Sequence, residues 1–334
     1  MSVVIIGCGV SGLTSGIRLL EAGRAVTIVT RELPADTTSN VAAAYWYPYR
    51  AAPRNRVFAW AKRTYQVFQS IASDCESGVV PRIARQYRFT AGGEFPLQEI
   101  AEGFRLLRGD ELFGEWRSGI EFRVFLAETT YYVPWLRKRF ESLGGVIELA
   151  TIPPLRRASA ADFPPALRDC DAIVDCAGVF AGELASDPSV QPVRGQVLRI
   201  ERPADMSDDI LDSSDDGFLA YIVPRSRDVI LGGTADEGDW SLDPREDHAR
   251  GIIERCTALF PTLGSPRVLG VRVGLRPGRP TVRVESESLP WGQRVVHNYG
   301  HGGAGFTLSW GCAEEVADLV EAPAAAPTAP ASAP

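Results

Sequence analysis

The N-terminal stretch VVIIGCGVSGLTSGIRLLEAG, residues 3–23, decides the fold of this 334-residue chain. It opens with an apolar run at 3–7, typical of a strand buried on both faces. A helical pattern follows and ends at Gly23, with apolar residues on one face at Leu13, Ile17 and Leu20. The run AVTIVT at 25–30 predicts a second strand. Together these segments predict a βαβ unit with parallel strands and a right-handed crossover.

Three glycines between the first strand and the helix follow the G-x-G-x-x-G pattern: Gly7, Gly9 and Gly12. The first allows a tight turn, the second lets backbone amides approach a pyrophosphate, and the third lets the helix pack against its strand. Because the motif lies between a strand and a helix, it predicts a dinucleotide site. Glu32, about 20 residues beyond the last glycine, suits a ribose partner, although a solvated turn charge is the alternative.

The later elements bear on the choice between NAD and FAD, which the glycine motif alone leaves open. Helices are predicted from 53 to 72 and up to Gly144, and strands at 146–150 and 171–178 are expected to return to the first sheet. Shorter alternating runs predict antiparallel strands at 195–200, 219–224 and 228–233. An NAD enzyme usually keeps its nucleotide domain in one block, so the returning strands favour a flavoprotein.

The predicted fold class is therefore α/β, with a Rossmann-type FAD-binding domain interleaved with a substrate domain on a mixed or antiparallel sheet. The chain is long enough for two packed cores, and one large α/β unit is the alternative. The FAD-binding domain is expected at 1–50, 145–190 and 268–322, and the substrate-binding domain at 51–144 and 191–267. The Pro/Ala-rich segment 323–334 is expected to be a disordered tail.

Composition excludes several classes of protein. A net charge of -7 without a long basic stretch argues against nucleic-acid binding. No apolar run approaches the ~20 residues that span a bilayer, and the N-terminus lacks the basic region of a signal peptide. The six cysteines show neither a CxxC pair nor zinc-ligand spacing, so we expect thiols, no metal site and a cytoplasmic location.

Six further segments together resemble the D-amino-acid oxidase family, in the family's order and spacing, up to about residue 320. They are NVAAAYWYPYR (40–50), DCAGVFAG (175–182), VRGQV (193–197), YIVPRSRDVILGGT (221–234), GLRPGRPTVRVE (274–285) and HNYGHGGAGFTLSWGCA (297–313). The resemblance implies an FAD-dependent oxidase that transfers a hydride from the α-carbon of a D-amino acid to flavin N5. The imino acid hydrolyses to a 2-oxo acid and ammonia, and dioxygen reoxidises the flavin, giving hydrogen peroxide. A homodimer is a further expectation of the resemblance.

The resemblance assigns the substrate carboxylate to Arg276 in GLRPGRP and to the hydroxyl of Tyr221 in YIVP. A planar guanidinium is suited to this role because it binds a carboxylate through two parallel hydrogen bonds. Without the resemblance, Tyr221 is a strand aromatic that favours the core. Rival arginines for the carboxylate are Arg272, Arg279 and Arg283.

The glycine-rich stretch before the last helix matches the family's flavin site. By resemblance, Gly302 and Gly303 lie beside the substrate amino group and the flavin ring, and a glycine carbonyl, assigned to Gly303, accepts a hydrogen from the amino group. A side chain there is expected to occupy the space of substrate or ring. The helix starting near Ala304 would stabilise the negative charge of reduced flavin with its N-terminal amides. His297 and His301 are expected to serve structure or flavin contacts, since no general base is required.

The residues expected to bind FAD come from the glycine motif, the end of the second strand, the loop at 37–43, the CAG turn and the start of the last helix. They are Gly7, Gly9, Val10, Ser11, Gly12, Arg31, Glu32, Thr37, Thr38, Val41, Ala42, Ala43, Cys176, Ala177, Gly178, Gly302, Gly303, Gly305, Phe306 and Thr307. For the loop and the CAG turn, an ordinary βα connection is the alternative.

Substrate choice is expected to depend on the segment 211–220. Gly217 stands where mammalian members of the family carry a lid tyrosine, which implies a short lid and a more open pocket. Three acidic residues in this segment should repel a second carboxylate unless they face solvent, namely Asp212, Asp215 and Asp216, and Arg225 or Arg227 could weaken this effect. Aromatic residues suited to an apolar side chain are Tyr45, Tyr47 and Tyr49, two of which could equally be core. We therefore expect neutral, apolar D-amino acids as substrates.

Four other functions remain open at this point. They are D-aspartate oxidase, a glycine or sarcosine oxidase, a flavin-dependent dehydrogenase that passes electrons to a quinone, and a non-catalytic nucleotide-binding module. Replacement of Arg276 or Tyr221 would have favoured the last, but both residues are present.

Overall fold

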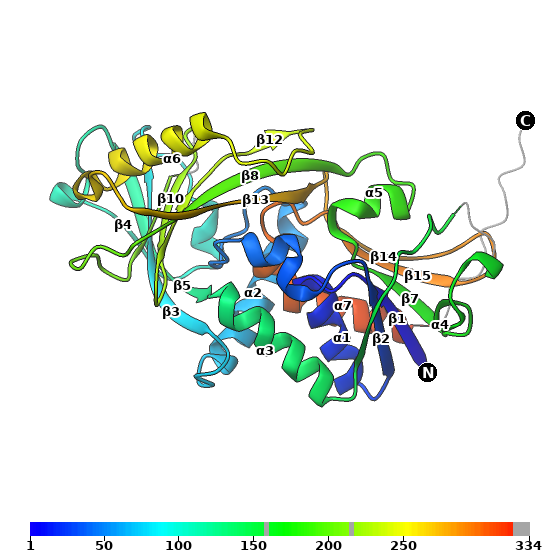
Figure 1. Ribbon diagram of the computed structural model, residues 1–334. Coiled ribbons are helices and arrows are strands. Elements are labelled where there is room, and N and C mark those ends of the chain that lie inside the picture. Colours follow the sequence, from blue (N-terminus) through cyan, green and yellow to red (C-terminus); the bar gives the residue numbers. More distant parts are fainter. Residues whose placement is uncertain (157–159, 214–216, 323–334) are drawn as a thin grey trace, which may run out of the picture.

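The chain folds around two β-sheets that lie next to each other along the long axis of the molecule (Figure 1). The structure, a computed structural model, describes residues 1–156, 160–213 and 217–322. Asp215, Asp216 and the expected tail at 323–334 lie outside the described residues. The predicted α/β class, with a parallel sheet interleaved with a mixed one, is confirmed.

Within the described residues, the first sheet has six strands in the order β14-β15-β7-β1-β2-β6. Its strands are β1 (Ser2–Ile6), β2 (Ala25–Thr30), β6 (Val146–Leu149), β7 (Ala172–Asp175), β14 (Arg283–Ser288) and β15 (Arg294–Tyr299). β1 pairs in parallel with β2 and β7, β2 with β6, and β7 with β15, whereas the edge strand β14 is antiparallel. The strands after residue 145 thus return to the first sheet, as expected.

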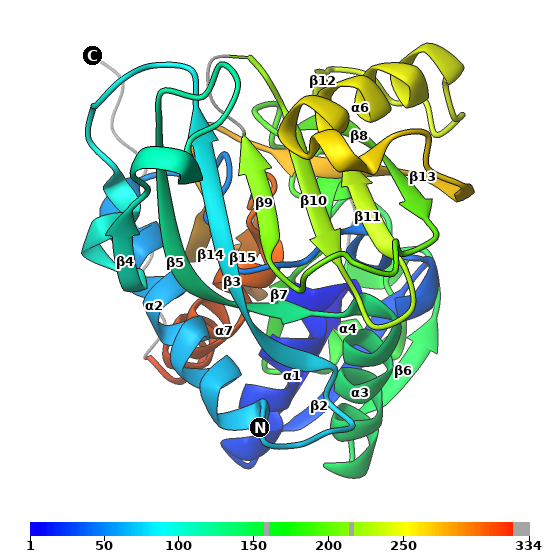
Figure 2. The same cartoon turned by 90° about the vertical axis from the view of Figure 1, so that its left-hand side faces the viewer.

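Alternation along β1 places apolar residues on both faces of this sheet. Val3 and Ile5 belong to the cluster that includes the apolar sides of α1 and α7, while Val4 and Ile6 face a separate cluster on the other side. The helices α1 (Val10–Glu21) and α7 (Gly305–Glu321) pack on the first face, and α3 (Thr129–Ser142) and α2 (Arg54–Ile71) pack against α1 and α7 respectively. Figure 2 shows these helices in the lower half of the molecule, below β9, β10 and β11 of the second sheet. Shorter elements are α4 (Pro165–Arg168), α5 (Ala181–Leu184), η1 (Pro34–Asp36), η2 (Thr38–Val41), η3 (Pro96–Glu99), η4 (Gly109–Glu111), η5 (Ala160–Asp162), η6 (Gly178–Phe180) and η7 (Pro261–Leu263).

The second sheet runs β12-β8-β11-β10-β9-β3-β5-β4, and β13 pairs with β8. Its strands are β3 (Val79–Arg88), β4 (Glu102–Leu106), β5 (Ser118–Ala127), β8 (Gln191–Ile200), β9 (Ile210–Ser213), β10 (Ala220–Pro224), β11 (Val229–Gly232), β12 (Asp236–Glu237) and β13 (Val268–Gly278). The buried residues Leu198, Ile222 and Leu231 lie opposite one another and pack under α6 (Glu246–Leu259). The residues next to each of them along the strands therefore face the other way, toward the first sheet.

No helix within the described ranges is long and apolar enough to cross a membrane. Each of the six cysteines, all of them in the described ranges, is a free thiol.

Gly311 lets two long helices touch at their backbones. A Cβ at this position would overlap the Cα and carbonyl oxygen of Trp60 in α2. The Gly311 amide also donates to the Thr64 hydroxyl at 3.1 Å. Neither contact leaves room for a side chain between α2 and α7.

We predict that Gly311→Ala lowers the free energy of unfolding by about 1–3 kcal/mol, because backbone atoms cannot move aside as a side chain can. Urea denaturation measures the change. Gly270→Ala is the control, because nothing lies within 4 Å of its Cβ position. Equal stability of the two variants would show that α2 and α7 separate freely.

A buried histidine ties three strands of the first sheet together. In β15, His297 Nδ1 lies 3.2 Å from the Asp175 carboxylate of β7, and Nε2 lies 2.8 Å from the Glu287 carboxylate of β14. Burial opposes protonation, but hydrogen bonds to Asp175 and Glu287 outweigh it and raise the pKa of His297. The hydrogen bond from His297 in turn lowers the pKa of Glu287 to about 2, against the effect of burial.

This cluster predicts a pH dependence of stability. Because the folded pKa of His297 is raised above its unfolded value of about 6.5, protonated His297 stabilises the fold below that pH. The stabilisation should be lost as the pH rises through the folded pKa. Urea denaturation at a series of pH values from about 6.5 upward should show the free energy of unfolding decreasing in the wild-type protein. The decrease should persist in His248→Gln, which lies outside the cluster, and should be absent in His297→Gln. The same slope in both variants would assign the effect elsewhere.

Candidate functional site

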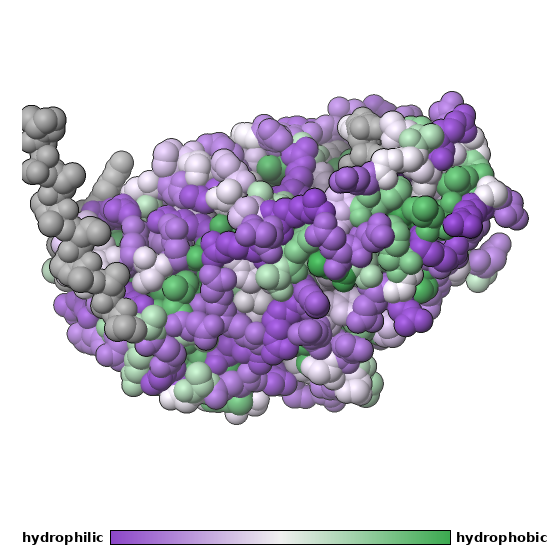
Figure 3. All heavy atoms as spheres, turned by 180° about the vertical axis from the view of Figure 1, so that it is seen from behind, coloured by the Kyte–Doolittle hydropathy of each residue, from purple (hydrophilic) through white to green (hydrophobic). Residues whose placement is uncertain are grey.

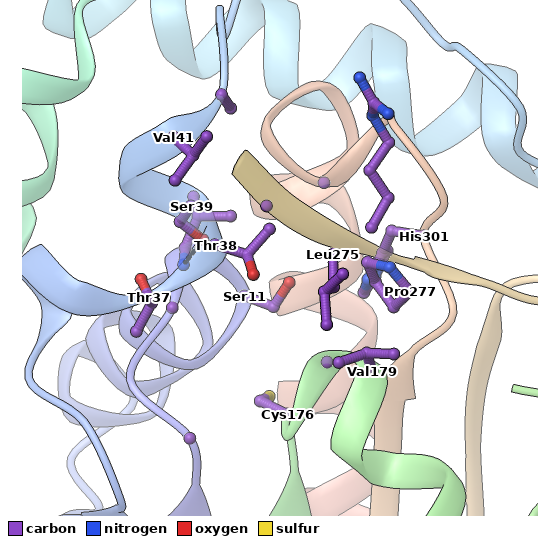
Figure 4. A pocket seen from close by; sticks show the side chains of 18 of the residues that line it. Ser11, Thr37, Thr38, Ser39, Val41, Cys176, Val179, Leu275, Pro277 and His301 are labelled. Atoms are coloured by element: carbon purple, nitrogen blue, oxygen red, sulfur yellow. Dashed lines mark hydrogen bonds between the residues drawn. The ribbon is translucent and has the colours of Figure 1, made fainter. Parts of the chain in front are cut away.

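A cavity of about 410 Å³ lies where the carboxyl ends of the parallel strands meet the inner face of the second sheet. Its lining runs from the glycine motif and Glu32 at one end to Tyr221 and Arg276 at the other. The carboxyl edge of a parallel sheet is where ligands of such folds bind. Figure 4 shows Ser11 and Leu275 facing the same space, with Thr37, Thr38 and Val41 beside it.

Two positions of the glycine motif require glycine because backbone atoms of other residues lie too close for a Cβ. Gly7 has a φ of +101°, and a Cβ there would lie 2.5 Å from the carbonyl oxygen of Cys176. A Cβ at Gly12 would overlap the Gly7 carbonyl oxygen. Gly12 therefore supports the turn and is absent from the cavity wall, whereas Gly7 and Gly9 line it.

Two helices begin at this cavity, and in neither does the N-cap residue itself supply a side-chain hydrogen bond. The residue before α1 is Gly9, and the residue before α7 is Ala304. The Ser39 hydroxyl accepts a hydrogen bond from the Val10 amide at 3.0 Å. First-turn amides of a helix are the standard partners of phosphate groups and other anions. The start of α1 thus suits a pyrophosphate, and the start of α7 suits a ring that becomes negatively charged.

Glycine is needed before α7 for a reason that was not expected from the sequence. A Cβ at Gly302, whose φ is +55°, would overlap the Arg50 carbonyl oxygen, and a Cβ at Gly303 would overlap the Tyr49 ring. Protein atoms, and not only a ligand, therefore exclude side chains at both positions. At Gly305 the nearest atom to a Cβ is Val10 Cγ1, at 3.8 Å. All three glycines line the cavity.

Arg276 and Tyr221 lie over two glycines of the inner face of the second sheet. A Cβ at Gly195 would overlap the Arg276 guanidinium, and a Cβ at Gly232 would overlap the Tyr221 ring. Gly232 pairs directly with Tyr221 across β10 and β11. Arg276 Nη1 also donates to the Thr234 carbonyl oxygen at 2.8 Å. The two glycines leave the space in which the guanidinium and the phenol lie.

The rival arginines lie outside the cavity wall. Arg272 donates to the Asn40 carbonyl oxygen at 3.1 Å, Arg279 to the Asp187 carboxylate at 3.0 Å, and Arg283 to the Tyr299 hydroxyl at 2.6 Å. Arg276 alone of the four lines the cavity in the described part of the chain.

The two basic residues that could have favoured a second carboxylate also lie elsewhere. Buried Arg225 donates to both oxygens of the Asp228 carboxylate, at 2.6 and 2.8 Å, and the Arg227 guanidinium lies 5.9 Å from the centroid of the Tyr131 ring. Neither lines the cavity. Asp212 does line it, as do Tyr45, Tyr47 and Tyr49.

The structure brings nearly all the expected site residues to this one cavity. Those that line it are Gly7, Gly9, Val10, Ser11, Arg31, Glu32, Thr37, Thr38, Val41, Ala42, Ala43, Cys176, Ala177, Gly178, Tyr221, Arg276, Gly302, Gly303, Gly305, Phe306 and Thr307. Of the expected site residues, Gly12 alone does not line the cavity. The roles assigned to these residues remain proposals.

Several lining residues escaped the site assignment made from the sequence. His301 lies in the wall with Asn298, whose side-chain oxygen is 3.0 Å from His301 Nε2, and Asn298 donates to Ser15 of α1 at 3.0 Å. Burial lowers the pKa of His301 to about 4, so the imidazole is neutral at pH 7. Phe180 lies 3.7 Å under the Arg31 guanidinium. Position within the GHGG and DCAG segments could have indicated His301 and Phe180, but no sequence signal indicated their contacts.

These features fit FAD. Two helix starts open onto one cavity, glycines at both ends remove side chains, and Glu32 lines the cavity together with the glycine motif. Among the described residues, no group of three or more His, Cys, Asp or Glu side chains could hold a metal ion.

Comparison with known proteins agrees with this geometry. The family model described as "FAD dependent oxidoreductase" matches residues 2–319. The chain is 48% identical to a D-amino-acid oxidase of Rubrobacter xylanophilus, over 96% of this chain and 95% of that protein. It is 36% identical to a human D-aspartate oxidase, over 95% and 94% of the two chains.

A solved structure shares the fold at low identity. A glycine oxidase from Bacillus cereus superposes with a TM-score of 0.78 at 18% identity, covering 96% of this chain and 94% of that one. The sequence expectations of an FAD cofactor and of kinship with D-amino-acid oxidases are confirmed by the family match and by the relatives. The chain therefore belongs to the FAD dependent oxidoreductase family and is related over nearly its whole length to D-amino-acid oxidases.

Proposed function

We propose that this chain is a D-amino-acid oxidase, which converts D-amino acids to 2-oxo acids and ammonia and reduces dioxygen to hydrogen peroxide. The observation that carries the proposal is the position of Arg276 and Tyr221 in one cavity with the glycine motif. The 48% identical relative that bears this name supports it. Bound FAD supplies the chemistry of the step, by accepting two electrons from the substrate α-carbon and passing them to dioxygen.

The substrate carboxylate is proposed to bind between Arg276 and Tyr221. Burial raises the pKa of Tyr221, and the Arg276 charge opposes this only in part. The phenol therefore stays protonated and can donate a hydrogen bond to the carboxylate. A guanidinium and a phenol together give charge-assisted hydrogen bonds to both carboxylate oxygens. The Gly303 carbonyl is proposed to accept a hydrogen from the amino group.

No side chain is needed to remove a proton from carbon. A neutral amino group drives cleavage of the α-carbon–hydrogen bond with its lone pair, so the protein contributes alignment and electrostatics. Neutral His301 hydrogen-bonds to Asn298 and is proposed to hold the start of α7 in place. The N-terminal amides of α7 are proposed to stabilise the charge of the reduced cofactor.

The remaining cofactor contacts follow the lining of the cavity. We propose that the amides of Gly9 and Ser11 bind the pyrophosphate beside Val10, whose own amide donates to Ser39, and that Glu32 binds the ribose. The segments 37–43 and 176–178 are proposed to enclose the ring system.

We propose that the enzyme prefers D-amino acids with neutral side chains to those with acidic side chains. Asp212 lies in the wall, whereas Arg225 and Arg227 lie outside it, so an acidic substrate side chain would meet a carboxylate there and neither of these two arginines. Tyr45 and Tyr47 add apolar ring surface. The 36% identical D-aspartate oxidase keeps that activity as the second candidate.

Three coarser proposals concern the whole molecule. Two domains are proposed with the ranges given above, although β13, at the start of the 268–322 segment, pairs within the second sheet. Free thiols support a cytoplasmic location. A homodimer is proposed, and Figure 3 shows apolar residues gathered at the end of the molecule that carries the second sheet. Size-exclusion chromatography with light scattering tests the dimer.

We predict that the purified yellow protein forms hydrogen peroxide with neutral D-amino acids and none with their L-isomers. The measurement is peroxide release across a panel of D-alanine, D-valine, D-phenylalanine, D-arginine, D-aspartate and their enantiomers. Preference for D-aspartate would favour the second candidate. Flavin bleaching without peroxide would contradict the use of dioxygen.

We predict that Gly195→Ala raises the KM for D-alanine at least about tenfold while FAD stays bound. The added methyl displaces the flexible Arg276 side chain, and loss of a charge-assisted pair costs about 1.5–3 kcal/mol. Arg276→Ala should raise KM and lower kcat in the same way. Gly270→Ala, in the same strand as Arg276 and without near neighbours, is the control. Normal kinetics in Gly195→Ala would remove Arg276 from the carboxylate site.

A further inference from the structure

A buried carboxylate forms part of the wall next to the proposed carboxylate site. Asp212 in β9 pairs directly with Tyr221 in β10, so the two side chains extend from the same face of the sheet. Asp212 is only 3% exposed, yet it lines the cavity. It lies one strand further from β13, which carries Arg276, than Tyr221 does. That position places it beside the substrate side chain rather than the substrate carboxylate.

The Asp212 carboxylate is held in a defined orientation. Tyr45 Oη donates to Oδ1 at 2.8 Å, and Gln86 Nε2 donates to Oδ2 at 3.1 Å. Gln86 also donates to the Tyr47 hydroxyl at 2.7 Å, and it pairs with Asp212 across β3 and β9. Burial and then the Asp212 charge raise the pKa of Tyr45, which therefore remains a donor. These hydrogen bonds fix the position of the Asp212 carboxyl group at the wall.

Two aromatic rings adjoin the carboxylate. Tyr45 and Tyr47 stack with centroids 5.9 Å apart and an angle of 26° between their planes. Both are half-buried and line the cavity. Ring faces bind methylene groups and also attract cations. An aliphatic stem that ends in a positive charge matches rings followed by a carboxylate.

We propose that Asp212, with Tyr45 and Tyr47, forms a side-chain subsite selective for D-amino acids whose long aliphatic side chain ends in a cation, such as D-lysine and D-arginine. The proposal rests on the proposed function and deepens it. The cation binds the Asp212 carboxylate by a charge-assisted hydrogen bond and the stem packs on the rings. A side-chain carboxylate is repelled at the same position, which excludes D-glutamate.

Achiral analogues without the α-amino group test the subsite separately from turnover. 6-Aminohexanoate, hexanoate and glutarate correspond to lysine, norleucine and glutamate, and each keeps the carboxylate that Arg276 and Tyr221 bind. Titration of the FAD-loaded protein, followed by flavin absorbance, gives their dissociation constants. We expect 6-aminohexanoate to bind at least about tenfold more tightly than hexanoate, and glutarate at least about tenfold more weakly. Equal or tighter binding of hexanoate overturns the proposal.

A variant assigns the preference to Asp212. In Asp212→Asn, which keeps the shape and removes the charge, the ratio of the hexanoate and 6-aminohexanoate dissociation constants should fall at least about fivefold. Asp208→Asn, an exposed acid in the preceding loop, should retain the ratio. An unchanged ratio in yellow Asp212→Asn overturns the proposal. If this variant does not retain FAD, the wild-type comparison decides.

Turnover separates the two proposals. Oxidation of D-norleucine without preference for the 6-aminohexanoate analogue would leave the D-amino-acid oxidase standing and remove the subsite. Preferential binding of 6-aminohexanoate without oxidation of any D-amino acid would keep the subsite and remove the oxidase.

Discussion

The contact between the Gly7 turn and the Cys176 carbonyl is the constraint on which the rest of the site depends. It sets the carboxyl ends of β1 and β7 against each other, since any Cβ at Gly7 would lie 2.5 Å from that oxygen. Gly12 closes the same turn from the other side by packing on the Gly7 carbonyl. The start of α1 then opens onto the cavity, with Ser39 placed to bind its Val10 amide. One cluster of backbone contacts thus fixes the cofactor end of the site.

The substrate end of the site also depends on glycines that allow close packing, in this case in the second sheet. Gly195 and Gly232 leave space over β8 and β11, and Arg276 and Tyr221 fill it. Strand alternation then places Asp212 on the face that carries Tyr221, while Leu198, Ile222 and Leu231 pack on α6 behind them. The apolar face stabilises the sheet, and the polar face bears the groups proposed to choose the substrate.

The βαβ unit could be predicted from the sequence because its periodicity is local, and α1, β1 and β2 lie where the pattern indicated. The long helix expected at 53–72 is α2 at Arg54–Ile71. Strand β3 was not foreseen, because Arg82, Arg85 and Arg88 recur at every third position and disguise the two-residue period of a strand. The residues of the cofactor cavity followed from family resemblance, but the contacts of Gly303 with Tyr49 and of Asp212 with Tyr45 join segments far apart in the chain. No single-sequence pattern records such contacts, and for that reason Asp212 was placed in a lid and not in the cavity wall.

The most direct test of the account is a crystal structure of the FAD-loaded protein with hexanoate bound. We expect both carboxylate oxygens to lie within hydrogen-bond distance of the Arg276 guanidinium and the Tyr221 hydroxyl, above Gly195 and Gly232. Cofactor density should run from the start of α1 to the start of α7. A carboxylate bound to any other arginine, or a cofactor that leaves the cavity between those two helices empty, would contradict it.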